Sequence, residues 1–127
     1  MNKEFDVLDF FFNWKGRIGR KHFWFGHIGL AVVSNIIMAI LANYFKIENL
    51  FSDSIIGLIL FWTTMVIFLF AGFCLDIKRY HDRGKSGHWL WLYLIPIIGA
   101  IWILIELGFL KGTKGSNKYG EDTLKIN

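Results

Sequence analysis

The sequence has only one cysteine and one proline, and three long runs of it contain no charged residue. Because Cys74 has no second cysteine to pair with, an intramolecular disulfide is excluded. Cys74 also lies inside an apolar run, so we interpret it as a small buried hydrophobic residue and not as a reactive thiol. The uncharged runs cover residues 23–45, 54–75 and 89–105. Runs of this length favour a membrane protein over a soluble domain.

Apolar residues make up 54% of the chain, and they are gathered into blocks instead of being mixed with polar ones. The net charge is +4. In a membrane protein, excess Lys and Arg reflects orientation and attraction to anionic headgroups, so we expect anionic lipids as partners and no nucleic acid. The first apolar run is too long for a signal peptide and no cleavage pattern follows it. We therefore expect it to be retained as a membrane span.

The pattern predicts a single all-α membrane domain over residues 1–127. In residues 1–22, Asp6, Asp9 and Asn13 would form a narrow polar stripe on a helix, which fits an interfacial amphipathic helix or a helix packed against the bundle. Run 23–45 would reach about 34 Å as a helix, enough to span the membrane. The predicted order is an interfacial segment 1–22, span 1 at 23–45, span 2 at 54–75, a cytoplasmic polar loop 76–88, span 3 at 89–110 and a flexible polar tail 111–127.

The third run has two interpretations. Its length favours a third transmembrane helix, but Pro96 and Gly99 interrupt it and allow a re-entrant hairpin. Three full spans place nine Lys and Arg inside and five outside, whereas a re-entrant run places thirteen inside and only Lys46 outside. Both interpretations put the N-terminus and residues 76–88 in the cytoplasm. They differ in the side of the C-terminus.

Residues 79–88 form a polar cluster between two apolar runs, and residues 16–24 form a second basic cluster on the same predicted side. Guanidinium groups at headgroup level bind phosphate in a bidentate way, so we expect the two clusters to share a site for lipid headgroups or a protein partner. Plain positive-inside charge is the simpler alternative. The candidate residues are Arg17, Arg20, His22, Trp24, Arg79, His81, Asp82, Arg83, Lys85 and Ser86.

Three sharper kinds of site fit the polar cluster less well. A phosphate-binding loop ending in Gly84-Lys85-Ser86 needs a glycine where Arg79 stands. A metal site at His81 and Asp82 needs further ligands, and a hydrolase triad in one tight loop has no evident oxyanion hole. We therefore expect no metal and no cofactor, and binding instead of catalysis. The alternative function is a small transporter or channel component that uses Glu106, Asn35 and Asn43.

Four ordered motifs resemble those of the domain of unknown function 805 family, the YhaH-like bacterial inner membrane proteins. The first is Gly16-Arg17-Ile18-Gly19-Arg20-Lys21-His22-Phe23-Trp24, and the second is Arg79-Tyr80-His81-Asp82-Arg83-Gly84-Lys85-Ser86-Gly87-His88-Trp89. The later ones are Ile95-Pro96-Ile97-Ile98-Gly99 and residues 111–120. His88 stands where the family usually has Trp.

This resemblance implies a small multi-span protein of the bacterial inner membrane, and it implies no activity. The expected function is therefore non-enzymatic binding of lipid headgroups or of a protein partner at the cytoplasmic face. The partner would be a second copy of the chain or another membrane protein. A metal- or lipid-dependent membrane enzyme is the third interpretation.

Overall fold

The computed structural model describes residues 6–47 and 54–123. Its regular elements are helices, so the expected all-α class is confirmed for this part of the chain, where Asn117 and Gly120 form one isolated bridge. Three parts of the predicted layout lie outside the described residues. They are positions 1–5 of the interfacial segment, the connection 48–53 and positions 124–127 of the tail.

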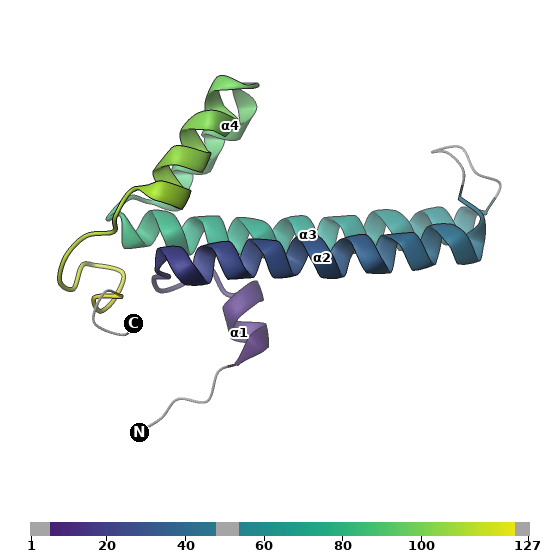
Figure 1. The fold of residues 1–127 in the computed structure, drawn as a ribbon, viewed down its shortest axis with the longest axis horizontal. Coiled ribbons are helices and arrows are strands. Elements are labelled where there is room, and N and C mark those ends of the chain that lie inside the picture. Colours follow the sequence, from purple (N-terminus) through teal and green to yellow (C-terminus); the bar gives the residue numbers. More distant parts are fainter. Residues whose placement is uncertain (1–5, 48–53, 124–127) are drawn as a thin grey trace.

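Two long helices, α2 (Arg20–Phe45) and α3 (Ile55–Asp82), lie side by side as an antiparallel hairpin (Figure 1). Both are long and apolar enough to cross a membrane, as expected for the first two spans. At 1.5 Å per residue they measure about 39 and 42 Å, more than the roughly 30 Å of a hydrocarbon core. The excess lies at one end, because α3 continues to Asp82 through residues expected to form a loop.

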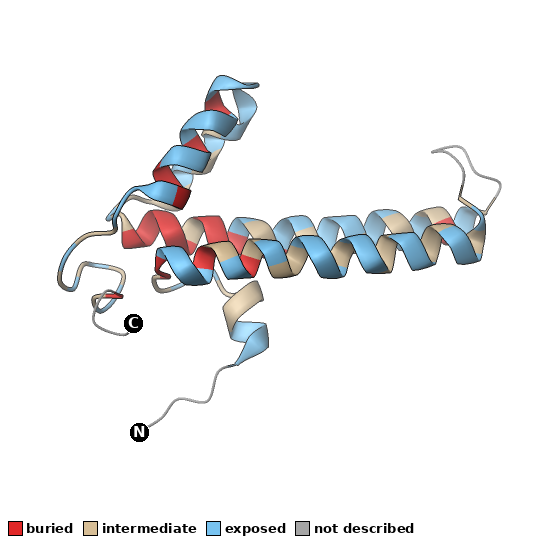
Figure 2. Cartoon of the chain, viewed as in Figure 1, coloured by how far each residue is buried: buried red, intermediate tan, exposed pale blue. Residues whose placement is uncertain are grey.

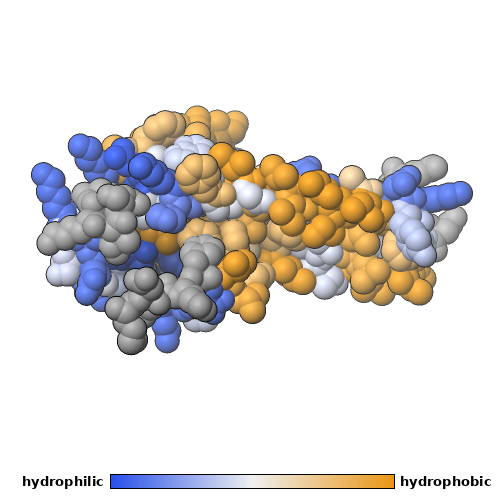
Figure 3. All heavy atoms as spheres, turned by 60° about the horizontal axis from the view of Figure 1, so that its bottom comes forward, coloured by the Kyte–Doolittle hydropathy of each residue, from blue (hydrophilic) through white to orange (hydrophobic). Residues whose placement is uncertain are grey.

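The hairpin has an apolar surface along most of its length and buried polar residues at one end. We call residues 28–45 of α2 and 55–73 of α3 the apolar shaft. No residue of it is charged, and its buried residues are only the small Gly57 and Ala71. Burial is concentrated at the end of the hairpin beyond the shaft, where α3 ends (Figure 2). Hydrophilic residues gather at this end, and the hydrophobic surface extends from it along the shaft (Figure 3). This arrangement suits a shaft surrounded by lipid, because water would disfavour so large an apolar surface.

The third apolar run folds as an arm of three short helical elements, so a third span over 89–110 is not confirmed. A 3₁₀-helix, η1 (Gly87–Leu94), is followed by α4 (Ile98–Ile103) and by the π-helix η2 (Leu104–Phe109). The chain reverses at Pro96, which cannot donate a backbone hydrogen bond, and at Ile97, whose φ is 65°. A Cβ atom on Gly99 would lie 1.8 Å from the Leu92 carbonyl oxygen, so only glycine permits this close return.

Both ends of the arm meet the polar end of α3. At its beginning, a Cβ atom on Gly87 would contact Ile77 at 3.1 Å. At its end, the Leu107 carbonyl accepts a hydrogen bond of 2.7 Å from Arg79 Nε. The arm stands off from the hairpin near this end (Figure 1). The run therefore leaves the polar end and returns to it.

The N-terminal helix α1 (Val7–Phe12) has only six residues, so an amphipathic helix over the whole N-terminal segment is not confirmed. Asp6 caps it by accepting hydrogen bonds from two backbone N–H groups, and the chain is extended at Asn13, where the helix stops. Lys78 of α3 donates hydrogen bonds of 2.9 and 2.7 Å to the carbonyls of Asp9 and Phe10. The helix is thereby attached to the polar end of the hairpin.

Candidate functional site

The structure brings the two polar clusters of the sequence together. Arg17, before α2, forms an ion pair of 3.0 Å with Asp82 at the end of α3, and both side chains are almost fully buried. His81 Nδ1 lies 3.1 Å from the Gly16 carbonyl oxygen. We call this region the polar junction and define it as Arg17, residues 78–83, Lys85, Glu106 and the backbone groups that they bind.

Asp82 is the centre of the polar junction. Its carboxylate accepts hydrogen bonds from Arg17, from Arg79 and from Thr123 Oγ1, the last at 2.7 Å. A buried carboxylate is stable only when such donors replace its water shell. A Cβ atom on Gly112 would lie 2.0 Å from one carboxylate oxygen, so glycine permits the tail to pass close to Asp82. One carboxylate thus connects the N-terminal segment, α3 and the tail.

The basic residues of the two clusters cap the C-terminal end of the arm. The last carbonyls of a helix have no partner within it, and in a membrane they need another donor. Here five consecutive carbonyls, those of residues 107–111, receive side-chain donors. Arg79 binds the first and the fourth, and the other donors are Trp24, Arg20 and Arg83. Positive charge at this end also complements the helix dipole.

Glu106 is paired inside the polar junction. It lies in η2, buried to 3% exposure, with Arg83 Nε at 3.0 Å and Lys85 Nζ at 2.8 Å. Burial alone would raise the pKa of Glu106, but the hydrogen bonds and charges of Lys85 and Arg83 outweigh burial and lower it. Lys85 also lies 4.2 Å above the Trp89 ring. Glu106 therefore holds the arm against the residues that follow α3.

The described part of the tail, residues 111–123, is folded onto the polar junction, although the sequence predicts a flexible segment. Thr113 N donates to the Asp82 carbonyl at 2.8 Å, and Asn117 Nδ2 donates to the His81 carbonyl at 2.9 Å. The Tyr119 ring stacks on His81 with 3.8 Å between centroids. The tail gains its order from these long-range contacts, which no local pattern in the sequence indicates.

The structure gives several of the residues predicted to bind lipid headgroups a structural role instead. Arg79 is fully buried and Arg17 nearly so, and their guanidinium groups bind protein carbonyls and Asp82. A lipid phosphate cannot reach Arg79 in this arrangement. Arg20 and His22 are exposed at the start of α2, and the His22 ring lies 6.4 Å from that of Phe10. The buried arginines therefore stabilise the fold, and the exposed Arg20 also contributes a hydrogen bond to the Phe109 carbonyl.

The remaining motif residues lie along a groove of 730 Å³ between α3, η1 and the tail. We call it the aromatic groove, because Trp14, Phe70 and Trp91 contribute to its walls. Its polar side chains include His81, Ser86 and His88. His88 Nδ1 lies 3.3 Å from Ser86 Oγ, and Lys118 Nζ lies 4.9 Å from the centre of the Tyr119 ring. The groove combines a wide apolar wall with a hydrogen-bonding end, and Lys118 adjoins this end through its contact with the lining residue Tyr119.

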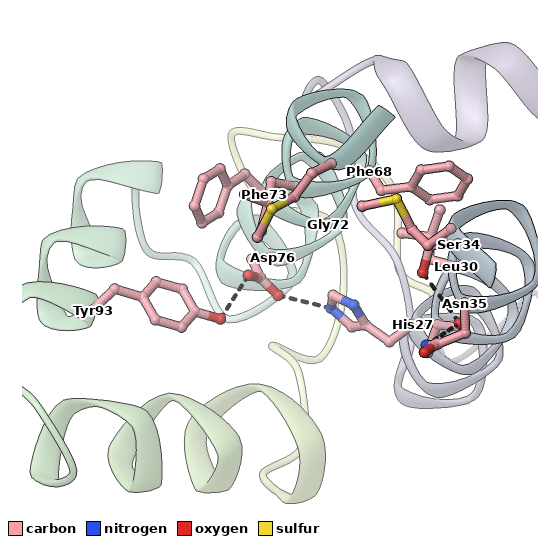
Figure 4. A pocket seen from close by; sticks show the side chains of 13 residues that line it. His27, Leu30, Ser34, Asn35, Phe68, Gly72, Phe73, Asp76 and Tyr93 are labelled. Atoms are coloured by element: carbon pink, nitrogen blue, oxygen red, sulfur yellow. Dashed lines mark hydrogen bonds and ion pairs between the residues drawn. The ribbon is translucent and has the colours of Figure 1, made fainter. Parts of the chain in front are cut away.

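A second groove, of 610 Å³, lies between α2 and α3 along the apolar shaft. We call it the shaft groove. At its polar end, Asp76 accepts hydrogen bonds of 2.9 Å from His27 Nε2 and from the Tyr93 hydroxyl, as Figure 4 shows. Sequence reasoning missed this group. One feature of the sequence could have indicated it. The uncharged run 23–45 contains only two titratable side chains, His27 and Tyr44, and a histidine inside a membrane span needs a polar partner.

The structure does not bring the predicted transport residues together. Glu106 lies in the polar junction, Asn35 lines the shaft groove, and Asn43 is exposed near the far end of α2. Asn35 also uses its amide to bond the Ala31 carbonyl of its own helix at 2.7 Å. In the described part of the chain, no three His, Cys, Asp or Glu residues are grouped as metal ligands. The three predicted transport residues therefore lie in three different parts of the molecule.

Comparison with known proteins identifies relatives over nearly the whole chain. The profile of the family described as "Protein of unknown function (DUF805)" matches residues 11–121. The inner membrane protein YhaI of Escherichia coli is 35% identical, over 91% of this chain and 90% of its own. The uncharacterized protein YiiR is 30% identical over 94% and 92%, and the inner membrane protein YhaH is 28% identical over 91% of each chain, both in the same organism. No solved structure matches significantly.

Proposed function

Since the chain belongs to the DUF805 family, which includes inner membrane proteins of Escherichia coli, we propose that it is a membrane protein that binds an anionic phospholipid in the aromatic groove. The observation that carries the proposal is the division of labour among the motif residues. Arg17 and Arg79 are internal, whereas His81, Ser86 and His88 line a groove. The activity is binding at the membrane surface, without a chemical step.

The proposed topology has two spans and one re-entrant arm. Thirteen of the fourteen Lys and Arg residues belong to the N-terminal segment, the stretch 78–85 and the tail, and Lys46 is the other one. The positive-inside rule then places the polar junction and both termini in the cytoplasm. The return of the arm to Arg79 supports this arrangement, because a third span would carry Leu107 to the opposite side. The aromatic groove then lies at the cytoplasmic headgroup level.

The chemistry of the aromatic groove favours a phospholipid with a net negative charge. Phe70, Phe73 and Leu94 offer an apolar wall for an acyl chain, and Trp14 and Trp91 suit the interface between headgroup and hydrocarbon. At the polar end, His88 and Ser86 offer hydrogen bonds and Lys118 offers positive charge. A phosphate group accepts both kinds of interaction. In this proposal, His88 and Lys118, which lie outside the polar junction, bind the phosphate of the lipid.

Native mass spectrometry of the protein in mild detergent, titrated with phosphatidylglycerol, tests this proposal. We expect one bound lipid at low concentrations. In the double variant His88→Leu/Lys118→Gln, affinity should fall by about tenfold, because a hydrogen bond and a charge contact are lost. Neither residue belongs to the polar junction, so the fold should persist. The same spectra report whether the protein forms homo-oligomers.

Lys21→Gln is the matched control, because Lys21 is exposed and lies outside the aromatic groove. It removes the same charge as Lys118→Gln and should leave phosphatidylglycerol affinity unchanged. Equal losses of phosphatidylglycerol affinity in Lys21→Gln and Lys118→Gln would show that the lipid is attracted by positive charge in general and not by the aromatic groove. Unchanged affinity in the double variant would likewise overturn the proposal.

A further inference from the structure

We propose that the shaft groove is a second lipid site, for an uncharged lipid whose head carries a hydroxyl group, of the diacylglycerol class. Its head would bind His27, and one acyl chain would lie between α2 and α3. The two grooves share Phe73 and Tyr93 in their walls, but His27 and Asp76 line the shaft groove and not the aromatic groove, so the proposal does not depend on a lipid in the aromatic groove. The inference rests on the arrangement of His27, Asp76 and Tyr93 and on the composition of the groove beyond them.

The polar end of the shaft groove offers one open hydrogen-bonding position. Asp76 is 4% exposed, and each of its carboxylate oxygens already has a donor, from His27 Nε2 and from the Tyr93 hydroxyl (Figure 4). The His27 side chain is 30% exposed, and among the described residues none bonds its other ring nitrogen, Nδ1. Asp76 fixes the orientation of the imidazole, because an ionised carboxylate only accepts hydrogen bonds and Nε2 must donate. Nδ1 remains available to a ligand.

The charges around this position select the head of the lipid. Of the described residues that line the shaft groove, none is Lys or Arg, and the nearest fixed charge is the Asp76 carboxylate. A phosphate or carboxylate group would therefore meet a like charge without a compensating cation. A hydroxyl group can donate a hydrogen bond to Nδ1 without bringing a charge into the groove. An uncharged, hydroxyl-bearing head is the complementary ligand.

The rest of the shaft groove has the shape and chemistry of an acyl-chain site. It extends along α2 from His27 to Met38, which is about 16 Å at the helical rise and about half of a hydrocarbon core. Its walls are mostly apolar, with Leu30 and Phe68 on opposite helices. Gly72 keeps it open, because an added Cβ atom there would meet only His27, at 3.8 Å. A membrane lipid can enter from the side, since the shaft is exposed along its length.

Photocrosslinking tests the site directly. The protein is reconstituted in phosphatidylcholine vesicles that contain a diacylglycerol with a diazirine on one acyl chain, and crosslinked peptides are mapped by mass spectrometry. We expect crosslinks on residues 27–38 and 65–76, competed by unlabelled dioleoylglycerol and not by phosphatidylglycerol. Gly72→Leu, which places a larger side chain at a position that lines the groove, should lower this crosslinking by about tenfold, as should His27→Leu, which removes the proposed hydrogen bond to the head.

Gly29→Leu is the matched control for Gly72→Leu. Gly29 is also within the shaft but does not line the groove, and an added Cβ atom there has nothing within 4 Å. It should crosslink like the wild-type protein, and circular dichroism should show equal helix content in all variants. Equal crosslinking in Gly72→Leu and Gly29→Leu would overturn the inference, as would competition by phosphatidylglycerol. Phosphatidylglycerol affinity of Gly72→Leu, measured separately, should be unchanged, so the two lipid sites succeed or fail independently.

Discussion

The two ends of the α2–α3 hairpin use opposite kinds of interaction. In the apolar shaft, large side chains such as Ile36 and Ile59 are more than half exposed, and the buried residues are Gly57 and Ala71. In the polar junction, Arg79 and Asp82 are buried and bonded to segments far away in the sequence. The shaft needs lipid as its solvent, whereas the junction creates its own polar interior. In the described part of the chain, tertiary contacts are therefore concentrated at the polar end of the hairpin. The buried charged groups lie there beside a small apolar core, which consists of Ile18, Phe23, Leu75, Tyr80, Ile103 and Leu107.

The difference follows from what each environment lacks. Between two lipid-exposed helices there is no hydrophobic driving force, so close packing of small residues contributes most of the contact. At the membrane surface, by contrast, the carbonyls at the end of the arm need donors that lipid cannot supply. Arg79 and Trp24 supply them from two different helices. The comparison predicts that substitutions in the polar junction cost far more stability than equal substitutions in the shaft.

The largest effect is expected for Asp82→Ala. The substitution leaves the buried Arg17 and Arg79 without their shared carboxylate, and removing one partner of a buried ion pair costs about 3–5 kcal/mol. Unfolding in a mild detergent titrated with sodium dodecyl sulfate, followed by circular dichroism, measures the loss. A stability equal to that of the wild-type protein would show that the junction is not what holds the segments together.

Glycine substitutions make the second comparison, because the same change is possible at both ends. Gly112→Ala would place Cβ 2.0 Å from an Asp82 oxygen, which should cost about 1–3 kcal/mol through overpacking. Gly29→Ala in the shaft meets nothing within 4 Å and should stabilise the helix by about 0.5–1 kcal/mol. The same titration distinguishes the opposite signs. Two equal losses would contradict the contrast between the regions.

A single capping bond gives a smaller effect. Trp24→Phe keeps an aromatic ring but removes the indole N–H that donates to the Gly108 carbonyl, so stability should fall by about 1 kcal/mol. Hydrogen–deuterium exchange should also increase in η2, because the end of the arm loses one of its attachments. Trp62→Phe in the shaft is the control, since Trp62 is 45% exposed. Similar changes in both variants would argue against a specific role of the cap.

The smallest effect is expected for Ile36→Ala in the shaft. Ile36 is 55% exposed, so in lipid the substitution creates no cavity and should alter the unfolding free energy by less than about 0.5 kcal/mol. The same deletion at Leu107, which is fully buried beside the junction, should cost about 2–5 kcal/mol. A large loss at Ile36 would mean that another surface covers the shaft.

Much of the layout can be predicted from local sequence. The uncharged runs predict the two spans, because lipid excludes charge along the whole length of a helix. The end of α3 is less predictable. The charged residues Asp76 and Lys78 mark where the uncharged run ends, but the helix continues past them to Asp82. The arm is harder still, because its length also fits a span. Its return depends on the contact of Gly99 with Leu92 and on caps from Arg79, which are long-range contacts.

The candidate site is only partly predictable for the same reason. Motif positions indicate that Arg17 and Asp82 matter, but they do not show whether these side chains face a ligand or each other. Burial decides this, and burial follows from how four segments pack together. His27 and Asp76 lie in different helices, 49 positions apart, so their pairing needs the hairpin to be known. Local patterns thus predict membership in a site better than the role within it.

Labelling of single cysteines in spheroplasts tests the central claim most directly, namely that the arm returns and that the tail lies on the same side as the N-terminal segment. In a Cys74→Ala background, cysteines replace the exposed Lys15, Lys46 and Lys114. A membrane-impermeant maleimide should label Lys46→Cys in intact spheroplasts, and it should label Lys15→Cys and Lys114→Cys only after permeabilisation. Labelling of Lys114→Cys from outside, with Lys15→Cys still protected, would contradict the account and establish a third span.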